Sequence, residues 1–178
     1  MKQLTTIKNA VNEIAERLLQ DHILIKLIVD DTSDLSTELD EESYAETYSM
    51  ENMLKNNYIC LYPIVEADGI KDTTRNTFLV IKLSLISFSG VSEHQINGTG
   101  NIYITTNKAH YLLDGGQNRT LEICDRICRD LDGAKITSSK TINIDSISDI
   151  VVGEDRAGYS ISYDVTDQMN NVGEKASI

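Results

Sequence analysis

The residues best suited to chemistry in this 178-residue chain are a few thiols, imidazoles and one acidic turn. They are Cys60, Cys124, Cys128, His22, His94, His110 and Asp114-Gly115-Gly116. A nucleophile needs a base and an orienting carboxylate within reach, but His110 and Asp114 have no neighbouring thiol or hydroxyl in a strained turn. The histidines are scattered, and the cysteines lack zinc-ligand spacing. We therefore expect no catalytic residue, no cofactor-binding residue and no metal ligand.

Two of the thiols belong to an amphipathic helix expected between Gly115 and Gly133. Its apolar residues recur with the helical period at Leu121, Cys124, Cys128 and Leu131, with Ile123 and Ile127 beside them. Asn118 or Thr120 can cap its start, and Gly133 can end it. Cys124 and Cys128 are thus expected to pack as buried, reduced thiols.

The remaining elements are one more clear helix and a series of strands. Ile7, Val11, Ile14 and Leu18 predict an N-terminal helix that Thr5 or Thr6 can cap, whereas residues 23–29 fit either a strand or a short second helix. Strands are expected at 58–67, 78–88 (the longest), 101–106 after a 90–100 loop, 141–145 with a brief run at 150–152, and 158–166. Pro63 implies that the first of these lies at a sheet edge or contains a bulge.

Long strands joined by short turns predict an α+β fold. We expect a largely antiparallel sheet, with the N-terminal helix and the internal helix packed on one face and a more polar second face. Residues 1–166 would form a single domain, followed by a loose tail at 167–178. No apolar run is long enough to cross a membrane.

An acidic excursion at residues 30–56 interrupts this pattern. Between Asp30 and Glu51 there are nine acidic residues and no Lys or Arg, within a chain of net charge −12. The segment can be a solvated loop or an arm that docks on a basic partner, and the residues expected to bind such a partner are Asp34, Glu38, Asp40, Glu41 and Glu42. The same net charge disfavours specific binding of nucleic acid.

The order of these patterns resembles a family of phage proteins. It runs from Leu18-Leu19 through Leu24-Ile25-Lys26-Leu27-Ile28, Tyr58-Ile59-Cys60-Leu61-Tyr62-Pro63, an Arg75-led strand and Ile102-Tyr103-Ile104, to Leu113-Asp114-Gly115-Gly116-Gln117-Asn118-Arg119, one helix and two strands. Over residues 4–166 the chain is similar to the small neck proteins of tailed bacteriophages, the head–tail connector and tail-terminator group.

The resemblance implies a non-enzymatic virion protein without a cofactor. Such a protein is assembled in the host cytoplasm and forms a homo-oligomeric ring of six or twelve copies in the neck or tail. It contacts portal or adaptor proteins and tail-tube proteins, and DNA passes through it without specific binding. Two other classes stay open: an acidic monomeric adaptor or inhibitor of a basic protein, and an enzyme that gathers His110, Asp114 and a thiol.

Overall fold

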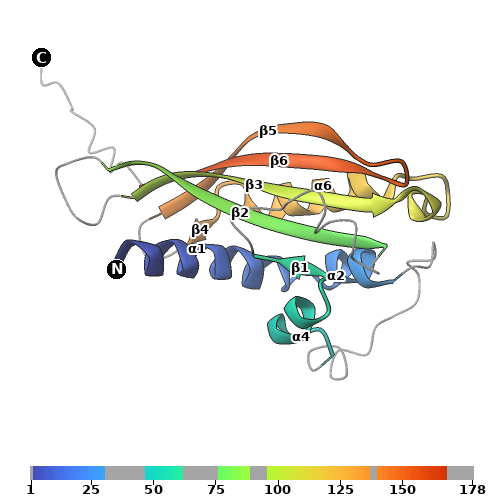
Figure 1. Ribbon diagram of the computed structural model, residues 1–178, viewed down its shortest axis with the longest axis horizontal. Helices are drawn as coiled ribbons and strands as arrows, with labels where there is room; N and C mark the ends of the chain where they lie inside the picture. The colour runs from blue at the N-terminus through green and yellow to red at the C-terminus, as the bar shows by residue number, and fades with distance from the viewer. Residues whose placement is uncertain (1, 31–46, 62–75, 89–95, 137–139, 168–178) are drawn as a thin grey trace, which may run out of the picture.

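A computed structural model describes residues 2–30, 47–61, 76–88, 96–136 and 140–167. The fold is α+β, as predicted: a mixed, mostly antiparallel sheet carries a layer of helices on one face (Figure 1). The helices are α1 (Lys2–Leu18), α2 (His22–Val29), α4 (Met50–Lys55) and α6 (Arg119–Leu131), with a 3-10 turn η1 (Lys108–His110). The strands are β1 (Ile59–Cys60), β2 (Thr77–Phe88), β3 (Ile96–Asn107), β4 (Lys135–Ile136), β5 (Lys140–Val152) and β6 (Arg156–Asp167).

The six strands lie in the order β1-β2-β3-β6-β5-β4, and only the β1–β2 pair is parallel. The helices α1 and α2 contact β2, whereas α6 contacts β3, β6 and β5. The apolar core therefore lies between one sheet face and these three helices. Its fully buried members include Ile14, Leu18, Leu24, Leu79, Ile102, Ile104, Ile123, Ile127 and Ile161.

Helix α2 settles the alternative that periodicity left open. Asp21 caps it by accepting hydrogen bonds from the N–H groups of Ile23 and Leu24, at 2.9 and 3.0 Å. The run read ambiguously because five consecutive residues of α2, 24–28, are buried, so no polar face marks the helical period. Helix α1 begins at Lys2, so the prediction that Thr5 or Thr6 caps it was wrong.

Helix α6 confirms the most definite prediction and corrects one detail. Asn118 caps it, and Gly133 follows it with a φ of 72°. The buried stripe is centred on Ile123 and Ile127, however, and Leu121 is 48 % exposed. The helix is therefore turned so that the flank carrying Leu121 and Cys128 is only partly covered.

The strands are longer than predicted. Strand β3 includes residues 96–100, which were expected to belong to a loop at 90–100. Position 100 of this strand requires glycine because the Tyr163 ring lies across it, and a Cβ there would be 2.2 Å from Tyr163 Cζ. The Tyr163 hydroxyl donates a hydrogen bond to Lys82 O at 3.0 Å. Strand β5 is one continuous strand of 13 residues, longer than the 12-residue β2 that was expected to be longest.

Strand β1 lies at the sheet edge, which is one of the two alternatives that Pro63 implied. It comprises Ile59–Cys60 of the expected 58–67, and Pro63 lies outside the described residues. Helix α4, capped by Ser49, falls inside the segment expected to be an acidic excursion. Strand β6 runs through Asp167, and residues 168–178 of the predicted tail lie outside the described part of the chain.

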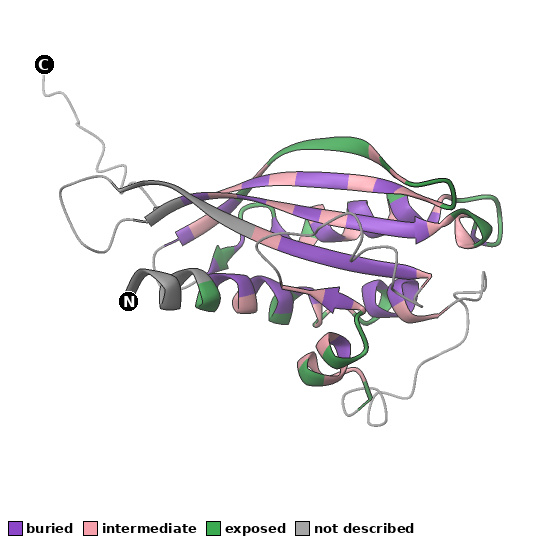
Figure 2. Cartoon of the chain, viewed as in Figure 1, coloured by how far each residue is buried: buried purple, intermediate pink, exposed green. Residues whose placement is uncertain are grey.

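The sheet face away from the helices is polar over β3 and β6, where Ser162 Oγ donates to Asn101 Oδ1 at 2.8 Å. At the β2 end this face is instead apolar and buried, with Phe78 beneath the Arg156 guanidinium at 5.2 Å and Val80 beside it. Burial is highest in the central strands and lowest along β5 (Figure 2). Within the described residues, no helix combines the length and apolar character needed to cross a membrane.

Candidate functional site

The outer edge of β5 is the most unusual surface of the described structure. One edge of β5 pairs with β6 along its whole length. On the other edge, β4 pairs only with Lys140 and Thr141, and Ile142 exchanges hydrogen bonds of 2.9 Å with Gly133 and Ala134. Among the described residues nothing pairs with β5 beyond Ile144, so we name residues 145–152 the open edge. Eight extended residues span about 27 Å of strand.

A β-bulge explains why pairing stops there. The register of β5 against β6 shifts between Ile144 and Ser146, which leaves Asp145 as the extra residue. A bulge bends its strand, and β5 arches outward in Figure 1. Asp145 and Asp149 are both exposed, and charges on an edge strand discourage pairing with arbitrary chains. The open edge is therefore selective toward the strands that can pair with it.

Exposed apolar side chains border the open edge. Ile147 is 48 % and Val151 74 % exposed, and both lie on the sheet face that α6 covers, in register with the core residue Ile161 and its neighbours. The half-exposed Leu121 lies on the flank of α6 that also carries Asp132, whose Oδ1 accepts a 3.0 Å hydrogen bond from Ile144 N–H of β5. We name Leu121, Ile147 and Val151 the apolar strip.

Single exposed apolar residues are ordinary on protein surfaces. Here, three of them accompany a strand whose outer backbone groups have no partner among the described residues. Unpaired strand backbone recognises another extended chain by main-chain hydrogen bonds, and the side chains beside it supply specificity. The arrangement is thus suited to binding a polypeptide segment.

The opposite flank of α6 is occupied by internal ion pairs. Arg126 Nη1 lies 2.8 Å from Asp21 Oδ2, and Arg17 Nε donates to Asp130 O at 2.6 Å. Burial acts to raise the pKa of Asp21, but hydrogen bonds from Leu24 N–H and Arg126 outweigh it, and the pKa lies below its ordinary value. Burial, and the nearby Asp21 charge, raise the pKa of Asp130. An open polar hollow lies here, lined by Arg17, Gln20, Asp21 and Asp130, and its charges join α1, α2 and α6.

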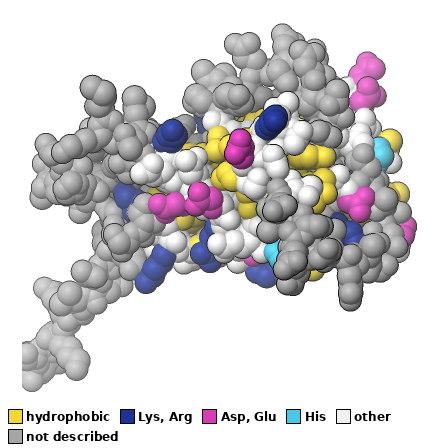
Figure 3. Space-filling model, turned by 90° about the horizontal axis from the view of Figure 1, so that it is seen from below, with side chains coloured by type: hydrophobic (Ala, Val, Ile, Leu, Met, Phe, Trp, Pro, Cys, Tyr) yellow, Lys and Arg dark blue, Asp and Glu magenta, His cyan; other side chains and the backbone are white. Residues whose placement is uncertain are grey.

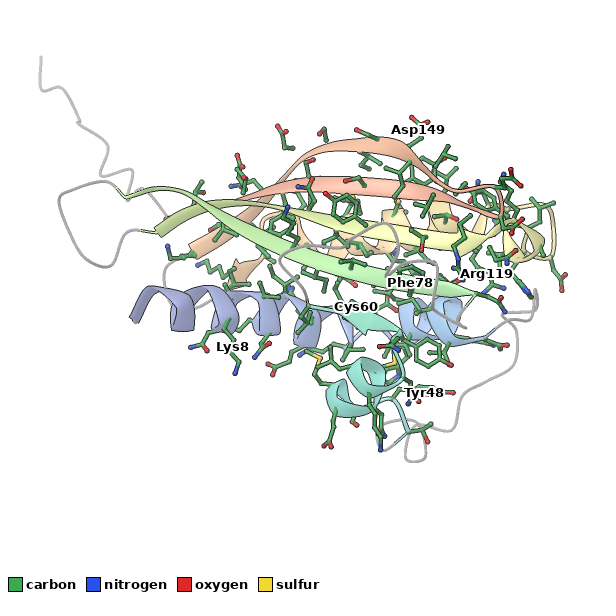
Figure 4. All side chains as sticks on the ribbon, in the orientation of Figure 1. Lys8, Tyr48, Cys60, Phe78, Arg119 and Asp149 are labelled. Carbon is green, nitrogen blue, oxygen red and sulfur yellow. The ribbon has the colours of Figure 1, made fainter. Side chains whose placement is uncertain are left out.

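Arg119 holds the other end of this helix layer (Figure 4). Its side chain is fully buried; Nε donates to His110 O at 2.9 Å, and Nη1 donates to Leu27 O at 2.9 Å and Asp30 O at 2.5 Å. It thereby links the start of α6 to the last turn of α2 and to η1. Sequence reasoning missed this role. The available signal was a cation in the first turn of a helix, where the macrodipole disfavours positive charge unless another interaction holds it.

The structure places the residues considered for chemistry as follows. Burial, and the neighbouring Cys128, raise the pKa of Cys124 to about 12; burial also raises the pKa of Cys60 and of Cys128. A thiol with a raised pKa is a poor nucleophile at neutral pH. Asp114 is exposed, and His110 lends its backbone carbonyl to Arg119.

No three His, Cys, Asp or Glu side chains of the described segments are grouped so as to hold a metal ion. The acidic residues expected to bind a partner, namely Asp34, Glu38, Asp40, Glu41 and Glu42, lie outside the described residues. That prediction therefore stays a prediction. The open edge, by contrast, was not recognised as a binding surface from the sequence.

Comparison with known proteins assigns the family. No curated protein matches the chain. The family described as YomW matches residues 21–165, which run from the cap of α2 to within two residues of the end of β6. The match includes α6, the bulged strand β5 and the open edge. The chain therefore belongs to the YomW family, a phage-type protein family.

Proposed function

We propose that this protein is a structural component of the phage neck. It forms a ring that joins the portal side of the head to the tail, or that terminates the tail tube, and DNA passes through the lumen. The observation that carries the proposal is the open edge with its apolar strip, on a chain of a phage-type family. Such a surface serves contacts between polypeptides, which are the work of a connector.

The charge of the protein suits a conduit for DNA. Its net charge is −12, and the described Lys and Arg side chains are interspersed with acidic ones on the face shown in Figure 3. Binding phosphates tightly requires clustered cations, whereas an acidic wall repels them. A duplex passing a protein of this net charge would slide rather than adhere.

Six copies would suit a tail terminator, and twelve would suit an adaptor seated on the portal. The neighbours of the ring would be portal or adaptor proteins on one side and tail-tube proteins on the other. The role needs no cofactor and no covalent chemistry. In this role the protein is assembled in the host cytoplasm and becomes part of the virion.

Self-association is the first property to test. The purified protein should form closed rings that grow in number with concentration, seen by negative-stain electron microscopy and by light scattering coupled to size exclusion. A compact monomer at every concentration, together with no binding to portal or tail-tube proteins, would refute the proposal. A monomer that binds a basic protein through residues 30–51 would instead identify an acidic adaptor or inhibitor.

A further inference from the structure

We infer that the open edge of β5 accepts an extended segment of a different protein, in which a Lys or Arg is flanked two residues away on each side by aliphatic residues. That the donor is a neighbouring neck or tail protein rests on the proposed function. The chemistry of the segment rests on β5 itself.

The backbone of the open edge can pair with an added strand. Alternate residues of a strand direct their N–H and C=O groups toward the same side, so residues 145–152 present a row of such groups away from β6. An added strand satisfies these groups and extends the sheet beyond β5. Residues 145–149 and Val151 of this stretch are exposed, and Figure 2 shows the arch of β5 in the colour of exposed residues.

The order of side chains on the helix-covered face determines which side chains an added strand must carry. There the open edge presents Ile147, Asp149 (labelled in Figure 4) and Val151 in turn, each exposed, and the strand register pairs Asp149 with Tyr159 of β6. Residues directly opposite each other on neighbouring strands interact most strongly, and opposite charges or two apolar groups are favourable pairs. The incoming strand must therefore offer aliphatic, cationic and aliphatic side chains at successive alternate positions. Leu121 extends the apolar border on the helix side.

Repulsion between aspartates disfavours a symmetric pairing of two copies through the open edge. Antiparallel β5–β5 pairing that sets Ile147 against Val151 also sets Asp149 against Asp149. Shifting the register so that Ile147 meets Ile147 sets Asp145 against Asp149. Like charges directly opposite each other are destabilising, and each copy already carries a net charge of −12.

No described strand of this chain has the required pattern of side chains. The cations in the described strands are Lys82, Lys135, Lys140 and Arg156. None of them has aliphatic residues at both flanking alternate positions: Lys82, for example, lies between Val80 and Ser84. Three segments of the chain have the spacing around Arg17, Lys26 and Arg129, but they lie in the helices α1, α2 and α6 and are not extended. The occupant is therefore a strand from another protein.

The test uses the full chain and short labelled peptides. Fluorescence anisotropy should show that a peptide containing Val-Thr-Lys-Thr-Val binds about tenfold more tightly than its Glu counterpart, since a favourable pair replaces a repulsive one. N-methylation of alternate amides in the Lys peptide should abolish binding. The Asp149→Lys variant should prefer the Glu peptide. The Glu16→Lys variant is the matched control, because Glu16 is exposed on α1, which contacts β2, and two strands separate β2 from β5; it should keep the original preference.

Equal affinity for the two peptides, or no binding of either, would overturn this inference. So would loss of ring formation in Asp149→Lys but not in Glu16→Lys, because the open edge would then be a contact between copies; the proposed ring itself would still stand. Conversely, selective peptide binding by a protein that never forms rings would support this inference and count against the ring.

Discussion

Replacing Arg119 by methionine is the sharpest test of how the helix layer is held on the sheet. Methionine keeps a long apolar stem but removes all the guanidinium donors. Three backbone carbonyls, those of Leu27, Asp30 and His110, would each lose a hydrogen bond. Two of them belong to the end of α2, where carbonyls have no partner within the helix.

The expected loss follows from burial. Hydrogen bonds to a charged group contribute about 1.5–3 kcal/mol each, but water can rehydrate some of the freed carbonyls. We therefore expect Arg119→Met to lower the free energy of unfolding by about 3–5 kcal/mol, as breaking a buried charged network does. For a domain of this size, that corresponds to a fall in Tm of roughly 6–20 °C.

The control is Arg129→Met, the same substitution nearer the C-terminal end of α6. The Arg129 side chain is 57 % exposed and pairs only weakly, with Asp125 at 3.3 Å, so Arg129→Met should cost less than about 0.5 kcal/mol. Both variants would be compared with the parent protein by circular dichroism during thermal and urea unfolding. If Arg119→Met unfolds no more easily than Arg129→Met, the anchoring role of Arg119 is wrong.

Three further predictions follow from other contacts. Asp21→Asn keeps a helix cap but loses the charge facing Arg126, so it should lower the free energy of unfolding by roughly 1 kcal/mol at pH 7. Because folding lowers the pKa of Asp21, this difference should shrink as the pH falls below about 4, and a pH-independent difference in urea unfolding would contradict it. Gly158→Ala should destabilise the protein by at least about 3 kcal/mol, since the added Cβ would lie 1.8 Å from Ile104 O of the paired strand, and a thermal melt like the parent's would show that the strands are further apart. Cys124 should resist iodoacetamide at pH 8 in the folded protein and react after denaturation, as followed by mass spectrometry, because burial raises its pKa to about 12; rapid labelling of the native protein would contradict this burial.

Elements with a single buried face could be predicted from the sequence. In α1 and α6 a polar face alternates with an apolar one, so the helical period is visible and both helices were found. In α2 the five consecutive residues 24–28 are all buried, and the same reasoning could not separate helix from strand. Residues 96–100 looked like a loop because the space that requires Gly100 is filled by Tyr163, more than sixty residues away.

The candidate surface is a property of strand order, which local patterns do not contain. That β5 is nearly an edge strand depends on β4 being too short to cover it, and the bulge at Asp145 made one long strand look like two short runs. Arg119 could not be recognised as an anchor because its three partners lie 9, 89 and 92 residues away in the chain.

Electron cryomicroscopy of purified particles of the encoding phage tests the central claim most directly. We expect density that fits this two-layer fold, repeated around the axis between portal and tail tube, with an additional strand from a neighbouring protein along the open edge of β5. Particles that are complete and infectious but contain no copy of this chain would contradict the account.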